Sequence, residues 1–350
     1  MIETPPSFAE TPDRPSGIDV LSDMLSAIRL TGSVFLNSRF TAPFGVVTPD
    51  RYDSDVPMAR MRHVSIFHLI ASGRCTIETA SGARREVSAG DILLMPFAEK
   101  HRIWNGDVPE MVDAPSLFQQ PVEGIWSIQH GGGGAETRIV CGYIESSEFV
   151  FTPLFHALPE LVVEAASEQR VGALIASTLS EILALADSAT PGAQVMLGRL
   201  MELLFVEVLR RHVARMAAGS EDRGWFAALN DGIVGRALQC VHAEPGRRWT
   251  TESLARAAGT SRTVLTERFN ALLGRPPMDY MTSWRIQLAA ERLRSGEASI
   301  ARIAADAGYE SEAAFNRAFK RITGVTPGRW RNSRDLPIFA PANPVAEAAE

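Results

Sequence analysis

A histidine between a proline and an asparagine is the first feature of this sequence that could do chemistry. The stretch GDILLMPFAEKHRIWN has a spacing that many small β-barrel enzymes use to present a metal ligand, carried by Gly90, Pro96, His101 and Asn105. Zinc and non-haem iron normally take three or four protein ligands, so His101 needs partners from other strands. The sequence therefore first raises the question of a metal site.

These four positions resemble the second conserved motif of the cupin superfamily, with Ala98 in place of a customary glycine. In metal-binding cupins the histidine of this motif is one ligand, and two histidines and a glutamate come from an earlier motif that ends in glycine. Gly73 matches that end, which puts Ile66 at the glutamate position and Met61 or Arg62 at the second histidine position. The resemblance implies the barrel fold but leaves the ligand set incomplete.

A second histidine is placed to meet His101. Side chains alternate along a strand, so His68 shares a face with Ile66, whereas His63 points to the other face. Glu78, one strand later, could supply a third ligand, although nothing in the sequence requires it. We therefore predict no metal and no cofactor, and instead an effector pocket that includes His68, Glu78, His101 and Trp104.

Residues 33–147 carry the strands of this barrel. They contain short β-rich runs such as SVFLNSRF, HVSIFHLIAS and DILLMP, separated by turn sequences such as TAPFG and SAGD. This pattern is typical of an antiparallel sandwich or barrel. With a short helix predicted over 20–30, we expect a disordered start over 1–16 and an all-β cupin-like sensor domain over 17–150.

A helical hairpin is predicted over 151–220. Two apolar stripes with helical period, in RVGALIASTLSEILALAD and QVMLGRLMELLFVEVLRRHVARM, are separated by SATPG. The second stripe is wide enough to bury two faces, which indicates either core or a dimer interface. The hairpin is therefore a candidate dimerisation element.

The compartment is suggested by cysteine usage and by the N-terminus. Cys75, Cys141 and Cys240 are too few and too scattered for a disulfide framework. The acidic, proline-rich N-terminus has neither the basic start nor the apolar core of a secretory signal. No uninterrupted apolar run reaches the roughly eighteen residues of a membrane span. We expect a cytoplasmic protein without a membrane partner.

The C-terminal third differs from the rest in charge. Gly246 to Asp335 holds sixteen Lys or Arg against nine Asp or Glu, although the formal net charge of the chain is −6. A basic module on an acidic protein suggests a partner that is a polyanion. A solvated basic face would have the same composition, so charge alone does not decide the function.

Two segments of this third share one organisation. TTESLARAAGTSRTVLTERFNALLG, residues 250–274, predicts a short helix, a tight turn at Gly259 and a second helix capped by Ser261. SIARIAADAGYESEAAFNRAFKRITG, residues 299–324, repeats it with Gly308 and Ser311. We predict an all-α domain over 228–332 with two helix-turn-helix units, followed by a disordered tail over 333–350.

The second helix of each unit has an expected buried face and an expected free face. Leu265 with Phe269, and Phe315 with Phe319, are four residues apart and fix the buried face. Among the free residues, Arg317 suits guanine and Asn316 suits adenine in a major groove. The candidate DNA contacts are Arg262, Thr263, Thr266, Glu267, Glu312, Ala313, Asn316, Arg317 and Lys320.

This module resembles the DNA-binding domain of the AraC/XylS family of bacterial transcription regulators, whose signature is matched by GYESEAAFNRAFKRITGVTPGRWR, residues 308–331. Glu267 departs from the polar or basic residue usual there, so the first unit is expected to read fewer bases. The order of barrel, hairpin and paired units resembles the cupin-containing subgroup. The resemblance implies a non-enzymatic regulator that binds promoter DNA, RNA polymerase and a small-molecule effector as a homodimer.

Three alternatives stay open. Cys141, in RIVCG, resembles a cysteine of oxidant-sensing members of this subgroup, so Cys75 and Cys141 could sense an oxidant, or could be buried small hydrophobes. The chain could instead be a cupin metalloenzyme of dioxygenase or isomerase type fused to a DNA-binding domain. It could also be an architectural DNA binder without an effector. Activation and repression are equally compatible with the sequence.

Overall fold

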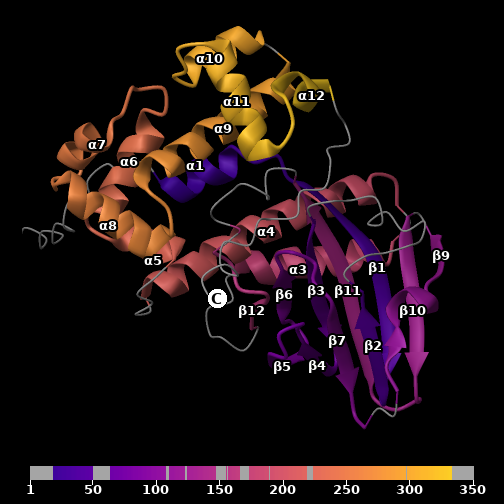
Figure 1. The fold of residues 1–350 in the computed structure, drawn as a ribbon. Coiled ribbons are helices and arrows are strands. Elements are labelled where there is room, and N and C mark those ends of the chain that lie inside the picture. The colour runs from indigo at the N-terminus through magenta and orange to yellow at the C-terminus, as the bar shows by residue number, and fades with distance from the viewer. Residues whose placement is uncertain are drawn as a thin grey trace, which may run out of the picture.

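The computed structural model has a β-rich N-terminal half and a helical C-terminal half (Figure 1). It describes residues 19–49, 64–107, 110–122, 124–146, 155, 157–165, 173–188, 190–218, 224–296 and 298–332. The predicted disordered start and tail fall outside these residues. Within them, no helix combines the length and apolar character needed to cross a membrane.

The N-terminal half is built from two sheets. Their strand orders are β12-β6-β3-β11-β1-β10-β9 and β5-β4-β7-β2-β8. The strands are β1 (Thr31–Thr41), β2 (Phe44–Thr48), β3 (Val64–Ser72), β4 (Arg74–Glu78), β5 (Arg84–Ser88), β6 (Ile92–Met95), β7 (His101–Asn105), β8 (Val112–Asp113), β9 (Gln119–Val122), β10 (Ile125–Gly131), β11 (Glu136–Glu145) and β12 (Val162–Glu164), with a 3-10 turn, η2, at Ala114–Leu117. Most neighbouring pairs are antiparallel, so the predicted β architecture is confirmed.

The larger sheet is buried on both faces. Along β3, Ile66 and Ile70 belong to the core inside the barrel, whereas Phe67 and Leu69 belong to the core beneath the helices. A strand covered on both sides reads as a continuous apolar run, which explains the sequence SIFHLIA. The covering helices are α3 (Ala173–Ala186) and α4 (Ala193–Ala218), which lie within the predicted hairpin region of 151–220. Earlier in that region the structure has strand β12, which pairs with β6, where the sequence predicts helix.

Glycines let α4 approach the sheet closely. A Cβ added to Gly32 of β1 would lie 2.6 Å from the carbonyl oxygen of Gly198, and one added to Gly198 would lie 2.7 Å from that of Gly32. Either side chain would therefore separate α4 from β1. The helical hairpin is therefore packed directly against the sensor sheet.

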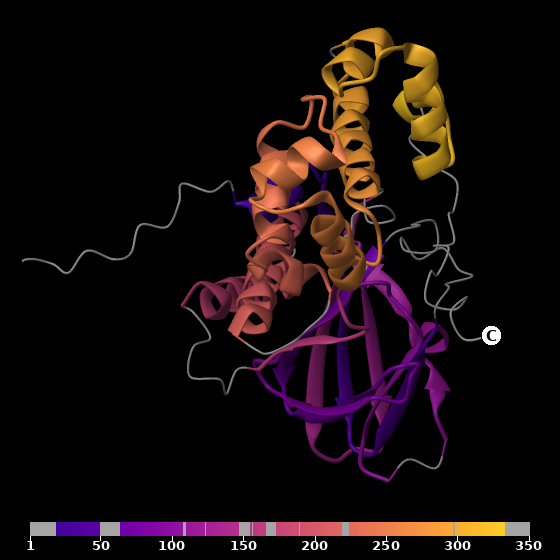
Figure 2. The same ribbon diagram turned by 60° about the vertical axis from the view of Figure 1, so that its left-hand side comes forward.

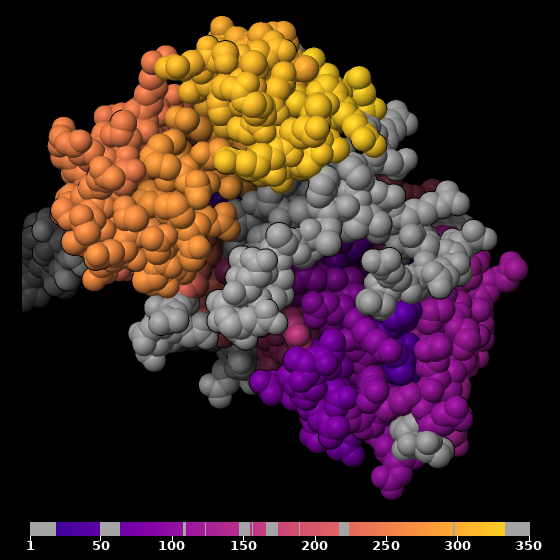
Figure 3. Space-filling view, viewed as in Figure 1, coloured from indigo at the N-terminus to yellow at the C-terminus, as the bar shows by residue number. Residues whose placement is uncertain are grey.

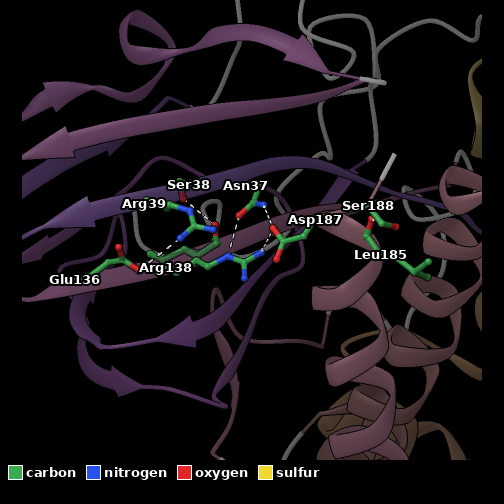
Figure 4. A network of polar contacts seen from close by, with 9 residues as sticks. Asn37, Ser38, Arg39, Glu136, Arg138, Leu185, Asp187 and Ser188 are labelled. Carbon is green, nitrogen blue, oxygen red and sulfur yellow. Dashed lines mark hydrogen bonds and ion pairs between the residues drawn. The ribbon is translucent and has the colours of Figure 1, made fainter. Parts of the chain in front are cut away.

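A polar network attaches the turn of the hairpin to the same sheet (Figure 4). Arg138 Nη2 donates to Asp187 Oδ1 at 2.7 Å, and Asn37 Nδ2 donates to the same oxygen at 3.1 Å. Arg138 Nε also donates to Asn37 Oδ1 at 3.1 Å, which closes the triangle. Asp187 follows α3 directly, so these bonds fix the turn over β1 and β11.

The C-terminal half contains the two predicted helix-turn-helix units. Its helices are α5 (Trp225–Asn230), α6 (Val234–Ala243), α7 (Thr251–Ala257), α8 (Arg262–Leu273), α9 (Pro277–Ser295), α10 (Ile300–Asp306), α11 (Glu312–Thr323) and α12 (Pro327–Asn332). Ser261 accepts from Val264 N and Ser311 accepts from Ala314 N, so both predicted caps are present. The long helix α9 joins the first unit, α7–α8, to the second, α10–α11 (Figure 2).

The two units belong to different cores. Phe269 of α8 lies in a hydrophobic cluster that continues through α6, α5 and α4 to the outer face of the sensor sheet. Phe315 and Phe319 of α11 lie in a separate cluster with α9, α10 and α12. The N-terminal helix α1 (Val20–Ser26) packs against α6, with Met24 fully buried. The first unit is therefore continuous with the sensor, whereas the second is attached through α9.

Candidate functional site

The predicted DNA-contacting residues lie on the outer faces of α8 and α11. Leu265, Phe269, Phe315 and Phe319 are fully buried, as the apolar spacing predicts. On the opposite faces, Arg262, Thr263, Glu267, Glu312, Ala313, Arg317 and Lys320 are exposed, and Thr266 and Asn316 are partly exposed. The first unit, in orange, and the second unit, in yellow, adjoin in the space-filling view (Figure 3).

On α8, several polar groups are already engaged. Thr266 Oγ1 donates to the Arg262 carbonyl oxygen at 2.9 Å, so its hydroxyl proton is used within the helix. Arg268 is paired with Asp231, a residue that also accepts from the amides at the start of α6. Val264 is 38% exposed on this helix, a position that the sequence reasoning missed. An exposed apolar side chain on such a face can contact a thymine methyl group.

On α11, the cations are less restrained. Arg317, Lys320 and Arg321 are exposed, and none of the ion pairs found among the described residues involves them. The helix has one acidic residue, Glu312, in its first turn. This helix therefore presents a net positive face to solvent.

Inside the barrel, the two predicted histidines meet. His68 of β3 and His101 of β7 are both buried, and their Nε2 atoms lie 2.8 Å apart. His68 Nδ1 lies 3.1 Å from Cys141 Sγ of β11, and His101 Nδ1 lies 2.8 Å from the Glu99 carbonyl oxygen. Four groups from different parts of the barrel thus form one chain of polar contacts.

Only one assignment of donors and acceptors satisfies these polar contacts. The Glu99 carbonyl can only accept, so His101 donates from Nδ1 and accepts at Nε2. His68 then donates from Nε2 and accepts at Nδ1 from the Cys141 thiol. Burial lowers the pKa of His101 to about 4 and lowers that of His68 well below its usual value, so both rings are neutral at physiological pH. The result is a neutral hydrogen-bond relay from Cys141 to Glu99.

The other two predicted pocket residues do not join this relay. On β7, His101 and Ile103 are buried, whereas Trp104 lies on the alternate face, with Arg84 over its ring. On β4, Cys75 and Ile77 are buried, whereas Glu78 lies on the alternate face and pairs with Arg84 and Arg102. The structure therefore brings His68 and His101 together and places Glu78 with Trp104 on the outer surface.

The residues of the interior do not fit the metal that cupins often hold. Among the described residues, no cluster of three or more His, Cys, Asp or Glu is arranged to bind a metal ion. Ile66, at the customary glutamate position, is a buried apolar residue, and both histidine Nε2 atoms are used by each other. Ala98 nevertheless keeps a positive φ of 49°, the backbone conformation of the glycine it replaces. The motif retains its backbone shape and His101, but the described residues do not supply the further ligands that a metal would need.

Both sensor cysteines are buried and protonated. Burial raises the pKa of Cys75 to about 12 and raises the pKa of Cys141 further. Both thiols are free in the structure. A thiol with a raised pKa holds little of the nucleophilic thiolate, so neither cysteine has the environment of a reactive one.

The architecture and the two sites define a class: a barrel sensor attached to a double helix-turn-helix DNA-binding domain. A cupin family model matches residues 19–214, and a helix-turn-helix domain model matches residues 254–333. The predicted fold class is thereby confirmed in both halves.

Relatives identify the family. A putative AraC-like transcription regulator of Streptomyces lividans is 30% identical over 329 residues, covering 91% of this chain and all of the relative. The RCS-specific HTH-type transcriptional activator RclR of Escherichia coli is 24% identical, covering 76% of this chain and 83% of RclR. The crystal structure of ToxT from Vibrio cholerae aligns with 87% of this chain and covers 97% of the ToxT chain, at 15% sequence identity and a TM-score of 0.33. The chain belongs to the AraC-like family of transcription regulators, as its sequence signature predicts.

Proposed function

We propose that this regulator binds promoter DNA through α8 and α11, which enter successive major-groove segments on one side of the duplex. The observation that carries this proposal is the repeated geometry: two serine-capped helices, each with one buried aromatic-containing face and one free polar face. Arg317 is suited to guanine and Asn316 to adenine, while Lys320 is suited to phosphate. Transcription control would then act in the cytoplasm, with RNA polymerase as a further partner.

The experiment is selection of bound duplexes from random DNA by the purified full-length protein, carried out with chelator and with added zinc, iron or manganese. We expect one bipartite site, whose two halves lie in successive major-groove segments, and we expect the same site with and without added metal. A matched selection with the Arg317→Ala variant should lose base preference in one segment only. Enrichment of no sequence at physiological salt would refute the proposal.

For the sensor, we propose that an effector acts on the relay of His68, His101 and Cys141. The relay is neutral and lies in a buried, apolar barrel. It can offer a hydrogen-bond donor and an acceptor to a small molecule if one hydrogen bond of the relay is broken. Glu78 and Trp104 can take part only from the outer surface. Mass spectrometry of small molecules released from denatured protein tests this: a compound retained by wild type should be lost from the His101→Phe variant.

The signal would reach DNA through the shared core. The hydrophobic cluster beneath α4 extends from Phe67 on the sensor sheet to Phe269 on α8, and α1 contacts α6 directly. An effector that favours one arrangement of this core would shift the population of DNA-competent molecules by its difference in affinity. The second unit lies in its own core and would follow through α9.

Self-association is proposed through the hairpin. On α4, Met196 and Leu203 are 50% and 42% exposed and lie seven residues apart, with the partly buried Leu200 between them. This spacing places them on one face of the helix. Sedimentation should show a dimer for wild type and a monomer for the Met196→Asp, Leu203→Asp double variant. Val122→Asp, at an exposed apolar position on β9, is the control and should leave the dimer intact.

Two other functions have less support. A metalloenzyme would require stoichiometric bound metal that is lost on His101→Ala, and the described residues do not assemble its ligands. An oxidant sensor would need a reactive thiol at Cys75 or Cys141. The raised pKa of Cys75 and of Cys141 favours slow oxidation instead. A bound small molecule is therefore the signal that the interior supports best.

A further inference from the structure

Two arginines occupy equivalent positions in the two helix-turn-helix units. The turn glycines Gly259 and Gly308 are 49 residues apart, and Arg236 of α6 and Arg285 of α9 are also 49 residues apart. Each arginine therefore lies in the helix that precedes its unit, at the same distance from the turn. This equivalence allows a direct comparison of what each guanidinium binds.

Arg236 binds within its own unit. Its Nε and Nη2 donate to the Ala258 carbonyl oxygen at 3.1 and 2.8 Å. Ala258 is the C-cap of α7, immediately before the turn at Gly259. Arg236 thus fixes the turn of the first unit to the helix that precedes it.

Arg285 binds across the two units. Its guanidinium lies beside the second turn, where a Cβ on Gly308 would be 3.0 Å from Nη2. Its hydrogen bonds, however, go to the loop before α7: Nε donates to the Pro245 carbonyl oxygen at 2.7 Å, and Nη2 donates to the Arg247 carbonyl oxygen at 2.6 Å. Arg285 is only 9% exposed, so these charge-assisted bonds are largely shielded from water.

The backbones that Arg285 joins are in direct contact. A Cβ on Gly308 would lie 2.8 Å from the Gly246 carbonyl oxygen, and a Cβ on Gly246 would lie 2.8 Å from the Asp306 carbonyl oxygen. An exposed ion pair, Arg248 to Glu310 at 3.2 Å, spans the same junction. The loop before the first unit and the turn of the second unit therefore approach as closely as glycine permits.

We infer that Arg285 is a positioning residue for DNA recognition: it sets the relative orientation of α8 and α11, and thereby the spacing of base pairs that both helices can read together. This inference rests on the proposed placement of α8 and α11 in successive major-groove segments. One added base pair moves the second segment along the duplex and turns it by about 34°. The hydrogen bonds of Arg285 join the two units at a second point, and therefore restrict the protein to sites with one spacing between the two segments. The helix α9 alone would connect each unit at one end only.

The test uses the full-length protein and the bipartite site selected by wild type. Affinity is measured on duplexes in which the distance between the two segments is shortened or lengthened by one and two base pairs, and on duplexes with one segment scrambled. For Arg285→Ala we expect the ratio between preferred and altered spacing to fall by roughly tenfold or more, because the substitution removes both charge-assisted hydrogen bonds to the loop before α7. Affinity for each single segment should be unchanged.

Two variants separate positioning from simple loss of structure. Arg236→Ala, at the equivalent position, should weaken binding to the first segment while the spacing preference stays as in wild type. Arg285→Lys keeps the charge but cannot reach both carbonyl oxygens in the same fork geometry, so it should restore only part of the preference. The inference is overturned if Arg285→Ala lowers affinity equally at every spacing.

A second route tests the same junction if Arg285→Ala fails to fold. Gly246→Ala leaves Arg285 in place but forces its Cβ against the Asp306 carbonyl oxygen, which moves the units apart. It should broaden or shift the preferred spacing, and an unchanged profile would contradict the inference. The proposed function fails separately, if wild type selects no bipartite site at all.

Discussion

The recognition helices α8 and α11 follow one plan but present different chemistry. On α8, the outer face combines Thr263, Val264 and Glu267 with the cation Arg262, while Arg268 is paired with Asp231. On α11, the outer face carries the exposed cations Arg317, Lys320 and Arg321. Phosphate attraction supplies most affinity that is independent of sequence. We therefore expect α11 to supply more of the electrostatic affinity for DNA than α8.

The units also differ in what supports them. The first shares a core with the sensor through α4 and α6, whereas the second has its own core with α9, α10 and α12. The unit with the weaker electrostatic attraction is thus the one most directly joined to the sensor. An effector can then act on the first unit directly, while the cationic second unit keeps the protein near DNA.

The largest expected effect comes from creating a cavity in each of the two hydrophobic cores. Phe319→Ala and Phe269→Ala each remove a fully buried ring and should cost roughly 3 to 5 kcal/mol of local stability. Because its core is separate, Phe319→Ala should increase amide exchange only in α10–α12 and in the C-terminal part of α9 that packs against them. Phe269→Ala should also increase exchange in α5 and α6. Amide hydrogen exchange, measured peptide by peptide, checks both expectations. If the two variants increase exchange in the same helices, the two units do not have separate cores.

Acid should affect the first unit before the second. Burial lowers the pKa of His242 in α6 to about 3, well below the value of about 6.5 in an unfolded chain. Between these values the unfolded chain binds more protons, so this stabilisation is complete above about pH 6.5 and is lost as the pH falls toward 3. The second unit contains no histidine, and the pKa of its Asp306 is held below 3.8 by a hydrogen bond from Arg292.

Urea unfolding at pH 7 and pH 4.5, followed separately in the two units by exchange, measures this difference. We expect the first unit to lose a few kcal/mol relative to the second. The His242→Gln variant should lose less, because its side chain has no proton to gain. A matching loss in both units, unchanged by His242→Gln, would show that the acid sensitivity arises elsewhere.

The sequence predicts most of the recognition surface because it depends on local rules. Ser261 and Ser311 mark where each helix begins, and aromatic or aliphatic residues four apart mark its buried face. The encounter of His68 with His101 also follows from strand alternation. The same alternation, applied from His101, places Trp104 on the opposite face of β7.

Contacts between distant segments are what local patterns do not encode. Arg236 and Arg285 have the same residue type and the same place in the repeat, yet one binds its own unit and the other binds its neighbour. That choice depends on the close approach of Gly246 to Gly308, which is a property of the packed domain. The contact between Cys141 and His68 likewise joins residues 73 positions apart in the chain, so no local pattern predicts it.

The smallest and most specific test compares two neighbouring cations on α11. If Arg317 reads a base, Arg317→Ala should weaken operator binding by roughly 1 to 3 kcal/mol and leave random DNA nearly unaffected. Lys320→Ala should instead weaken both DNAs alike and lower the slope of log affinity against log salt by about 1. Titrations of both variants at several salt concentrations distinguish these outcomes. If Arg317→Ala behaves like Lys320→Ala, Arg317 contacts phosphate, and base reading in the second segment falls to Asn316 and Ala313.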